Sequence, residues 1–283
     1  MTAPLRHVSD TALWVAMYRA MESERPDALF RDPYARRMAG ERGAEILRSM
    51  PRARSTAWPM VVRTAVMDEI ILRLVGEGVR TVINLAAGLD TRAFRLSLPP
   101  KLRWFDVDLP DMIAYRRQHL ADATPVCVHE EIAADMVDGV ARAAVVARAC
   151  AAGPAMIVTE GLLVYLTSEQ VTALARDARA EPEVRWWLMD LASPLLLKML
   201  KRSWQPRLAA ANAPMQFAPE EGTEFFAPLG WREVEFRSTW DESLRLRRTI
   251  ALAWLWNGLS RLRSKAVRER YRRMSGTVLL ERK

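Results

Sequence analysis

The chain has 283 residues, a formal net charge of +8, and a composition that is 50% hydrophobic and 27% charged, as is ordinary for folded proteins. No apolar run approaches the roughly 20 residues of a membrane span, and the first 30 residues lack the apolar core of a secretory signal. Cys127 and Cys150 are the only cysteines, and neither has a Cys or His at metal-ligand spacing. We therefore expect a protein of the reducing cytoplasm, with no metal site and no membrane contact.

The first 78 residues are predicted to form a helical cap. Amphipathic patterns predict helices over 11–21, with Asp10 as a favourable cap, over 34–48 and over 60–75. No strand pattern interrupts them, so the cap is expected to precede the sheet.

From residue 79 onward, short apolar segments alternate with segments long enough for crossover helices. Seven strands are predicted, at 81–86, 103–107, 125–129, 154–159, 184–190, 233–238 and 276–281. Near-continuous apolar strands with helices between them indicate a parallel sheet covered on both faces. The pattern predicts an α/β fold with a Rossmann-like, seven-stranded, mostly parallel sheet, in a single domain over 1–283.

Residues 191–217, after the fifth strand, do not follow this rhythm. They form an apolar and basic segment at the carboxyl edge of the sheet, where ligands bind in such folds. We interpret the segment as a lid or substrate wall, with a helix that merely packs on the sheet as the alternative.

The positive charge is concentrated in residues 261–273, which hold seven Lys and Arg and one Glu. Apolar residues recur there and just before at intervals of three and four: Leu252, Leu255, Leu259, Leu262 and Ala266. This spacing predicts one long helix over about 245–273 that buries its leucines and leaves its arginines in solvent. An acidic partner or a phosphate-bearing substrate is the alternative for the basic face.

The first strand breaks at Gly88 into a tight polar turn that opens a helix, which is where an adenine nucleoside most often binds in α/β proteins. The second strand should then end about 20 residues later in an acid for the ribose hydroxyls. Asp106 and Asp108 both lie there and alternate with apolar residues. We assign Asp108 to the ribose and a structural role to Asp106; a cap for the helix at Pro110 is the alternative for either.

Two further acids follow the third and fourth strands. Asp135 could bond the adenine amino group while Met136 covers the ring, although Asp135 could equally cap the helix after it. Glu160 ends a central strand, where burial without a partner would be costly, so a cationic ligand group is expected there, and Gly161 allows close approach.

Several blocks resemble, in order, the leucine carboxyl methyltransferase-like family of class I S-adenosylmethionine-dependent methyltransferases. They lie at 11–35, 82–95, 108–110, 160–165 and 213–231, and the first is closest to bacterial O-methyltransferases acting on polyketides and other natural products. The resemblance implies S-adenosylmethionine as cofactor and places its site on Arg63, Gly88, Asp108, Asp135, Met136 and Glu160. Arg63 would meet the cofactor carboxylate. The family turn is often Leu-Gly-Ala-Gly, so Ala86 replaces a glycine that approaches the ligand.

Methyl transfer from a sulfonium is an in-line displacement, so the protein has mainly to align the acceptor oxygen. His7, His119 and His129 are the only histidines and none lies in a motif, which favours a carboxylate or an acidic hydroxyl that needs no strong base. Tyr165 is a candidate on the acceptor side. Three arginines could orient an anionic acceptor: Arg19, Arg31 and Arg92.

The sequence therefore predicts a methyltransferase acting on a carboxylate or hydroxyl oxygen of a small metabolite. One alternative is a carboxyl methyltransferase of a peptide or protein C-terminus. Another is a non-catalytic or nucleic-acid-binding relative that uses the basic residues 261–273, although few aromatic side chains are interleaved with them. The sequence does not specify the acceptor or the oligomeric state.

Overall fold

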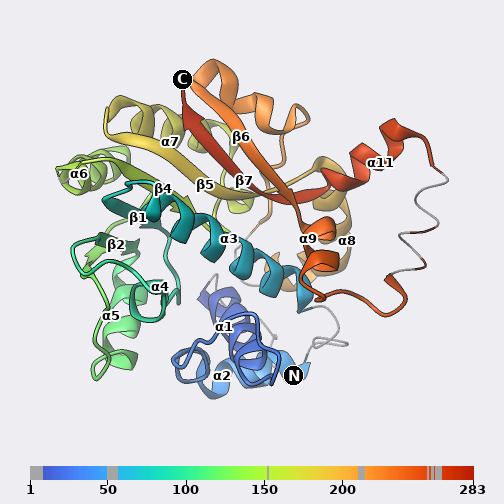
Figure 1. The fold of residues 1–283 in the computed structure, drawn as a ribbon, viewed down its shortest axis with the longest axis horizontal. Helices are drawn as coiled ribbons and strands as arrows, with labels where there is room; N and C mark the ends of the chain where they lie inside the picture. Colours follow the sequence, from blue (N-terminus) through green and yellow to red (C-terminus); the bar gives the residue numbers. More distant parts are fainter. Residues whose placement is uncertain are drawn as a thin grey trace.

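A computed structural model describes residues 9–49, 57–151, 153–209, 214–253, 255, 258 and 263–283. Its centre is one sheet of seven strands in the order β3-β2-β1-β4-β5-β7-β6, in which β7 runs antiparallel to the other six strands (Figure 1). The strands are β1 (Thr81–Leu85), β2 (Arg103–Asp108), β3 (Val128–Ala133), β4 (Ala155–Thr159), β5 (Val184–Ala192), β6 (Trp231–Ser238) and β7 (Ser275–Arg282). The predicted Rossmann-like α/β fold is confirmed.

Helices connect the strands and cover both faces of the sheet (Figure 1). Local sequence explains their starts: the Asp138 carboxylate caps α6, and Thr167 with Gln170 forms a capping box at α7. The α-helices are α1 (Ser9–Ser23), α2 (Ala35–Ser49), α3 (Trp58–Gly76), α4 (Arg92–Arg95), α5 (Pro110–His119), α6 (Gly139–Cys150), α7 (Ser168–Ala180), α8 (Pro194–Ala209), α9 (Thr239–Arg245) and α11 (Lys265–Arg272). Two short 3-10 helices are η2 (Leu163–Tyr165) and η3 (Gly222–Leu229). No helix in these described ranges is long and apolar enough to span a bilayer.

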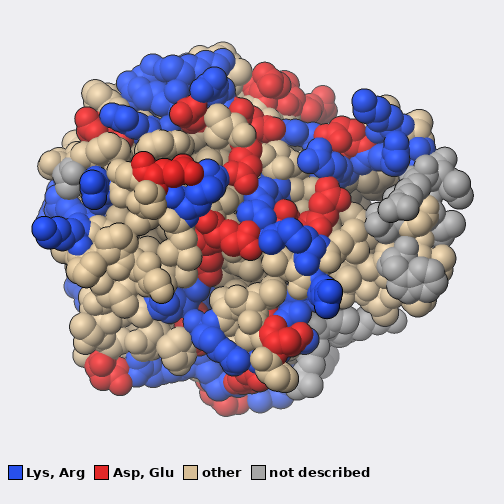
Figure 2. Space-filling view, in the orientation of Figure 1, with Lys and Arg blue, Asp and Glu red and all other residues tan. Residues whose placement is uncertain are grey.

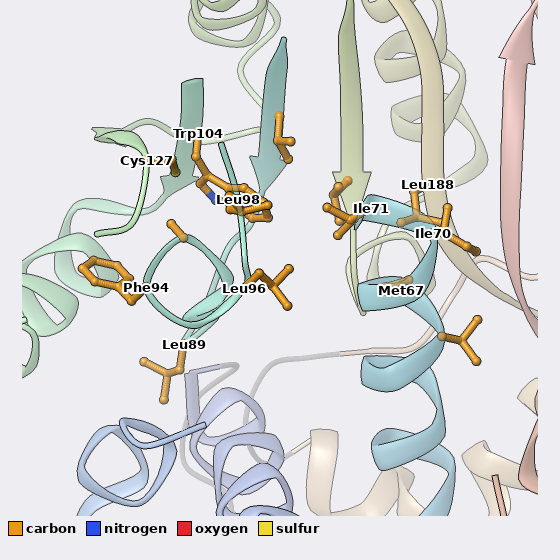
Figure 3. Close-up of a cluster of buried hydrophobic side chains, with 14 of the residues drawn as sticks. Met67, Ile70, Ile71, Leu89, Phe94, Leu96, Leu98, Trp104, Cys127 and Leu188 are labelled. Atoms are coloured by element: carbon orange, nitrogen blue, oxygen red, sulfur yellow. The ribbon is translucent and has the colours of Figure 1, made fainter. Parts of the chain in front are cut away.

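The core lies on both faces of the sheet, because successive residues of a central strand point to opposite sides. Val82 of β1 joins a cluster with α3, and the next residue, Ile83, joins a cluster with α6 and α7. Figure 3 shows Ile70 of α3 beside Leu188 of β5, and both belong to the same buried cluster. The helix α3 therefore packs directly on one face of the sheet, whereas α1 and α2 pack mainly on each other.

The third strand begins later than predicted. Residues 126 and 127 form a bend, in which the Val126 N–H donates to the Ala93 carbonyl, and β3 starts at Val128. This strand lies at the edge of the sheet, so it can carry the polar Glu130 and Glu131 in place of an apolar run.

The prediction of one long helix over 245–273 is wrong. The chain leaves α9 at Arg245, and Arg247 and Leu252 adopt the left-handed conformation (φ 53° and 60°), which a right-handed helix cannot include. Arg248 is instead buried against Glu22 of α1. The expected stripe is not buried either, since Leu252 is 57% exposed, Leu255 is 42% exposed and Ala266 lies on the exposed α11, while Leu259 and Leu262 are outside the described residues.

The segment predicted as a lid contains the end of β5 and α8, and its residues 210–213 are outside the described part. Its last residues return to η2, where the backbone N–H groups of Gln216 and Phe217 donate to the Val164 carbonyl. The segment therefore lies beside the loop that follows β4, and its role as a lid stays a prediction.

Ala86 has φ 53°, in the left-handed region where a side chain costs about 1 kcal/mol and glycine costs none. We expect Ala86→Gly to raise the free energy of unfolding by about 1 kcal/mol, measured by urea denaturation. The control is Ala87→Gly, because Ala87 is the next residue and does not have a positive φ. This substitution should lower the free energy of unfolding, since it adds chain entropy to the unfolded state and removes a buried methyl group. A less stable Ala86→Gly protein would contradict the strained turn.

Candidate functional site

The carboxyl ends of β1 and β2 meet because the two strands are parallel neighbours, with Leu85 opposite Val107. The Gly88 N–H donates to Asp108 Oδ2 over 2.6 Å, and the Leu109 N–H donates to Asp108 Oδ1 over 2.7 Å. Burial raises the pKa of Asp108, and no ion pair to it occurs within the described chain. Its carboxylate keeps acceptor capacity for ligand hydroxyls, as the ribose assignment requires.

Asp106 has a different environment from Asp108. It is buried and accepts hydrogen bonds from Asn84 Nδ2 over 2.8 Å, from Trp104 Nε1 over 2.9 Å and from the Arg116 guanidinium. Burial opposes its ionisation, but Arg116 and His129 outweigh burial and hold the pKa of Asp106 at about 2. Arg116 also donates to the Gly88 carbonyl over 2.9 Å, so this buried pair braces the turn from the side of the protein interior.

Glu160, directly after β4, already forms ion pairs with two arginines of the protein. Arg63 Nε lies 3.0 Å from Glu160 Oε1, and Arg92 Nη1 lies 2.7 Å from Glu160 Oε2. Burial opposes ionisation, and Arg92 and then Arg63 overcome it, so the pKa of Glu160 falls to about 2. The sequence predicted a cationic ligand group at Glu160. Two protein cations already pair with this carboxylate, one of them the acceptor-side candidate Arg92, and its contact with a ligand cation stays a prediction.

These residues belong to a larger network of ion pairs. Its members come from α1, the connection between α1 and α2, α3, α4, the turn after β1, and the carboxyl-end regions of β4 and β5. It contains the arginines Arg19, Arg63, Arg92 and Arg95 and the carboxylates Asp32, Asp68, Asp90, Glu160 and Asp190. With four arginines and five carboxylates, the network carries one net negative charge, and Arg92 Nη2 is buried there without a hydrogen-bond partner in the described structure.

Asp190, at the end of β5, is a site residue that sequence reasoning missed. Asp190 Oδ2 lies 3.0 Å from Arg63 Nη1, and Asp190 Oδ1 accepts the Gly161 N–H over 2.5 Å. Its side chain is 25% exposed. The signal was present, because an acid at the carboxyl end of the strand beside β4 is the same pattern that selected Asp108 and Glu160.

Asp135 and Met136 lie near Asp108, because the Ala134 N–H donates to the Asp108 carbonyl over 2.9 Å. Asp135 is exposed and accepts the Val137 N–H over 2.9 Å, so it does not cap α6, which Asp138 caps. Met136 is buried. Contact of these two side chains with an adenine ring stays a prediction.

On the acceptor side, Tyr165 of η2 is hydrogen-bonded to Thr11 of α1, and burial raises its pKa. The three arginines proposed to orient an acceptor are engaged elsewhere: Arg19 binds Asp32 and the Leu89 carbonyl, Arg31 donates to the Ser23 carbonyl, and Arg92 lies in the network.

The two histidines within the described ranges are engaged as well. His129 Nε2 lies 2.9 Å from Asp106 Oδ2, and His119 stacks on Tyr115. His7 lies outside the described residues. No cluster of His, Cys, Asp or Glu side chains in the described structure could hold a metal ion.

Two open cavities, of about 460 and 450 Å³, lie elsewhere, along η3, β6 and the start of α8. Both are lined by Glu221, Thr223 and Arg273, and neither reaches Asp108 or Glu160. The candidate site is therefore defined by its convergent side chains and not by these cavities.

Comparison with known proteins gives consistent matches. The family model described as leucine carboxyl methyltransferase matches residues 12–178. A protein from Parafrankia is 35% identical over 264 residues, covering 86% of this chain and 82% of its own length, and one from Streptomyces coelicolor is 37% identical over 234 residues (78% and 82%). Both are named provisionally as S-adenosyl-L-methionine-dependent methyltransferases. A crystal structure from Thermobifida fusca, described provisionally as a methyltransferase, aligns with a TM-score of 0.60 at 16% identity, covering 100% and 97% of the two chains, and shows the shared fold.

Because the buried ion pairs lower the pKa of Glu160 below its value in the unfolded chain, its contribution to stability should depend on pH. Its folded pKa of about 2 lies below the unfolded value of 4.5, so this stability is complete above about pH 4.5 and is lost as pH falls toward 2. We expect the fall in unfolding free energy between pH 6 and pH 3, measured with urea, to be about 2 kcal/mol smaller in Glu160→Gln than in the wild type. Glu130→Gln, which removes a pair with Arg148 at the surface, is the control and should keep the wild-type fall; identical pH profiles for wild type and Glu160→Gln would contradict the prediction.

Proposed function

The chain belongs to the leucine carboxyl methyltransferase family, and we propose that it is an O-methyltransferase of a small metabolite. Its cofactor is S-adenosylmethionine, which supplies an activated methyl group on a sulfonium when bound. The observation that carries the proposal is that Asp108 and the Arg63–Glu160 pair both lie at the carboxyl edge of the sheet, and that the pair belongs to a network that carries one net negative charge.

The residues present fit this cofactor. Asp108 keeps acceptor capacity for ribose hydroxyls beside the Gly88 turn, and Arg63 Nη2 has no hydrogen-bond partner among the described residues, so it can bind a carboxylate. S-adenosylmethionine carries an ammonium, a sulfonium and a carboxylate, which leaves one net positive charge. That charge complements the net negative charge of the network around Glu160.

An oxygen acceptor is supported by the family and by the lack of a free histidine base among the described residues. A carboxylate is already deprotonated at neutral pH and needs only alignment, whereas a phenol benefits from a base. Tyr165 and Thr11 join η2 to α1 beside Arg63, so α1 and η2 are proposed to border the acceptor. Because Arg19 and Arg92 are already paired, they would bind an anionic acceptor less well than the sequence suggested.

Two alternatives have some support. The family name supports a carboxyl methyltransferase of a peptide C-terminus. The exposed α11 supports a polyanion-binding relative, since Lys265, Arg268 and Arg270 have no ion-pair partner among the described residues and Figure 2 shows basic side chains gathered over this helix. The Tyr271 ring is covered by the Arg263 guanidinium at 5.0 Å, which leaves it less available for stacking on a base.

Calorimetric titration with S-adenosylmethionine and S-adenosylhomocysteine tests the cofactor site. We expect micromolar binding by the wild type, and at least a ten-fold loss of affinity in Asp108→Asn, because an amide cannot accept from both ribose hydroxyls as a carboxylate does. Asp122→Asn, which removes an exposed ion pair with Arg37, is the matched control and should bind as the wild type does. No heat with either ligand, together with steeply salt-dependent RNA binding, would favour the polyanion-binding alternative.

The acceptor class can be measured with S-adenosylmethionine labelled in its methyl group. We expect label to move to small carboxylic acids or hydroxyl compounds, and alkaline hydrolysis then separates the two, because a methyl ester releases labelled methanol and a methyl ether does not. Peptides with a free or an amidated C-terminus form the comparison set. Transfer only to the free-carboxylate peptides would contradict the small-metabolite proposal and favour the peptide alternative.

A further inference from the structure

Asp190 occupies a central place at the candidate site without a role in the proposed function so far. It lies two residues before the carboxyl end of β5 and beside the end of β4, because Thr159 is paired with Met189 and the next residues are Glu160 and Asp190. We infer that Asp190 is a positioning residue that sets the geometry of the subsite for the amino-acid tail of the cofactor. This inference rests on the proposed binding of S-adenosylmethionine at this edge.

Two carboxylates hold the Arg63 guanidinium in one orientation. Glu160 binds its Nε over 3.0 Å and Asp190 binds its Nη1 over 3.0 Å, so two different nitrogens are held by carboxylates from two strands. Two anchors fix the plane of the group, whereas Glu160 alone would leave it free to rotate about the Nε contact. The Nη2 group, without a partner among the described residues, is then presented to an incoming carboxylate in one defined orientation.

Asp190 also holds the backbone turn that follows Glu160. Gly161 has φ 67°, and its N–H donates to Asp190 Oδ1 over 2.5 Å. A side chain at this glycine would meet Arg63 Nη1 at 3.3 Å, so the turn and the guanidinium lie against each other. One carboxylate therefore fixes both the cation that would bind the ligand carboxylate and the turn beside the anion that would bind its ammonium.

Asp190 also contributes negative charge beside Glu160, where a ligand ammonium would bind. Glu160 already shares its two oxygens between Arg63 and Arg92, so it meets a ligand ammonium as a carboxylate that is largely neutralised. Asp190 is the more exposed of the two carboxylates, and it contributes one of the five negative charges that outnumber the four arginines of the network. Asp190→Asn removes that charge and the ion pair to Arg63 but keeps an oxygen that can accept the Gly161 N–H.

The test compares two ligands by calorimetry: S-adenosylhomocysteine, which has the amino-acid tail, and 5′-methylthioadenosine, which has the same nucleoside without it. In Asp190→Asn we expect the Kd of S-adenosylhomocysteine to rise about ten-fold or more and the Kd of methylthioadenosine to stay within about two-fold of the wild type. Asp190→Ala should show a larger rise for the first ligand only, and Asp190→Glu, which keeps the charge, should recover part of the loss. Asp122→Asn again serves as the matched control.

The outcomes separate this inference from the function it rests on. Equal weakening of both ligands in Asp190→Asn would show a general structural role and overturn the inference, as would unchanged binding of S-adenosylhomocysteine. If the Asn and Ala variants fail to fold, Asp190→Glu decides alone: tail-selective weakening supports the inference and equal weakening overturns it. Failure of the wild-type protein to bind either ligand would overturn the proposed function itself.

Discussion

Arg92 is only 2% exposed, yet it contacts three carboxylates, with Asp68 Oδ1 and Asp90 Oδ2 at 2.6 Å and Glu160 Oε2 at 2.7 Å. Removing a guanidinium from water costs several kcal/mol, and the cost is offset only when partners surround it with good geometry. Those partners come from α3, from the turn after β1 and from the end of β4, so the three elements must converge before the charge is stable. The candidate site is the place where they converge, and its residues keep their ionised forms because of this mutual pairing.

The periodic parts of the chain were predictable from sequence, and the pairings were not. Buried strands and their polar ends follow from local pattern, so the spacing of Gly88 and Asp108 along the chain was enough to place them together. The partner of Glu160 could not be found in this way, because Arg63 lies 97 residues away and nothing in a single sequence states which arginine reaches which acid. The long helix over 245–273 failed for a related reason: regular spacing of leucines predicts a helix, but it does not show that another surface exists to bury them.

The acceptor side and the cofactor side are physically joined. Arg19 of α1 binds Asp32 and also donates to the Leu89 carbonyl directly after the nucleoside turn, over 2.5 Å. Tyr165 of η2 binds Thr11 on the same helix, close to Arg63. A displacement of α1 would therefore change contacts at the nucleoside turn and at the proposed acceptor side together. The helix proposed to border the acceptor is thus mechanically coupled to the cofactor side.

The contact between Arg248 and Glu22 joins residues that are 226 positions apart. During synthesis the ribosome delivers α1 long before Arg248, so for most of translation the half-exposed Arg25, 3.7 Å from Glu22 in the folded protein, is the nearest cation available to this carboxylate. Burying Glu22 with that single weak partner would be costly, so we expect α1 to reach its final burial only after nearly the whole chain has emerged. The C-terminal part of the chain thus does more than complete the sheet with β7, because it also supplies the guanidinium that lets Glu22 of α1 be buried.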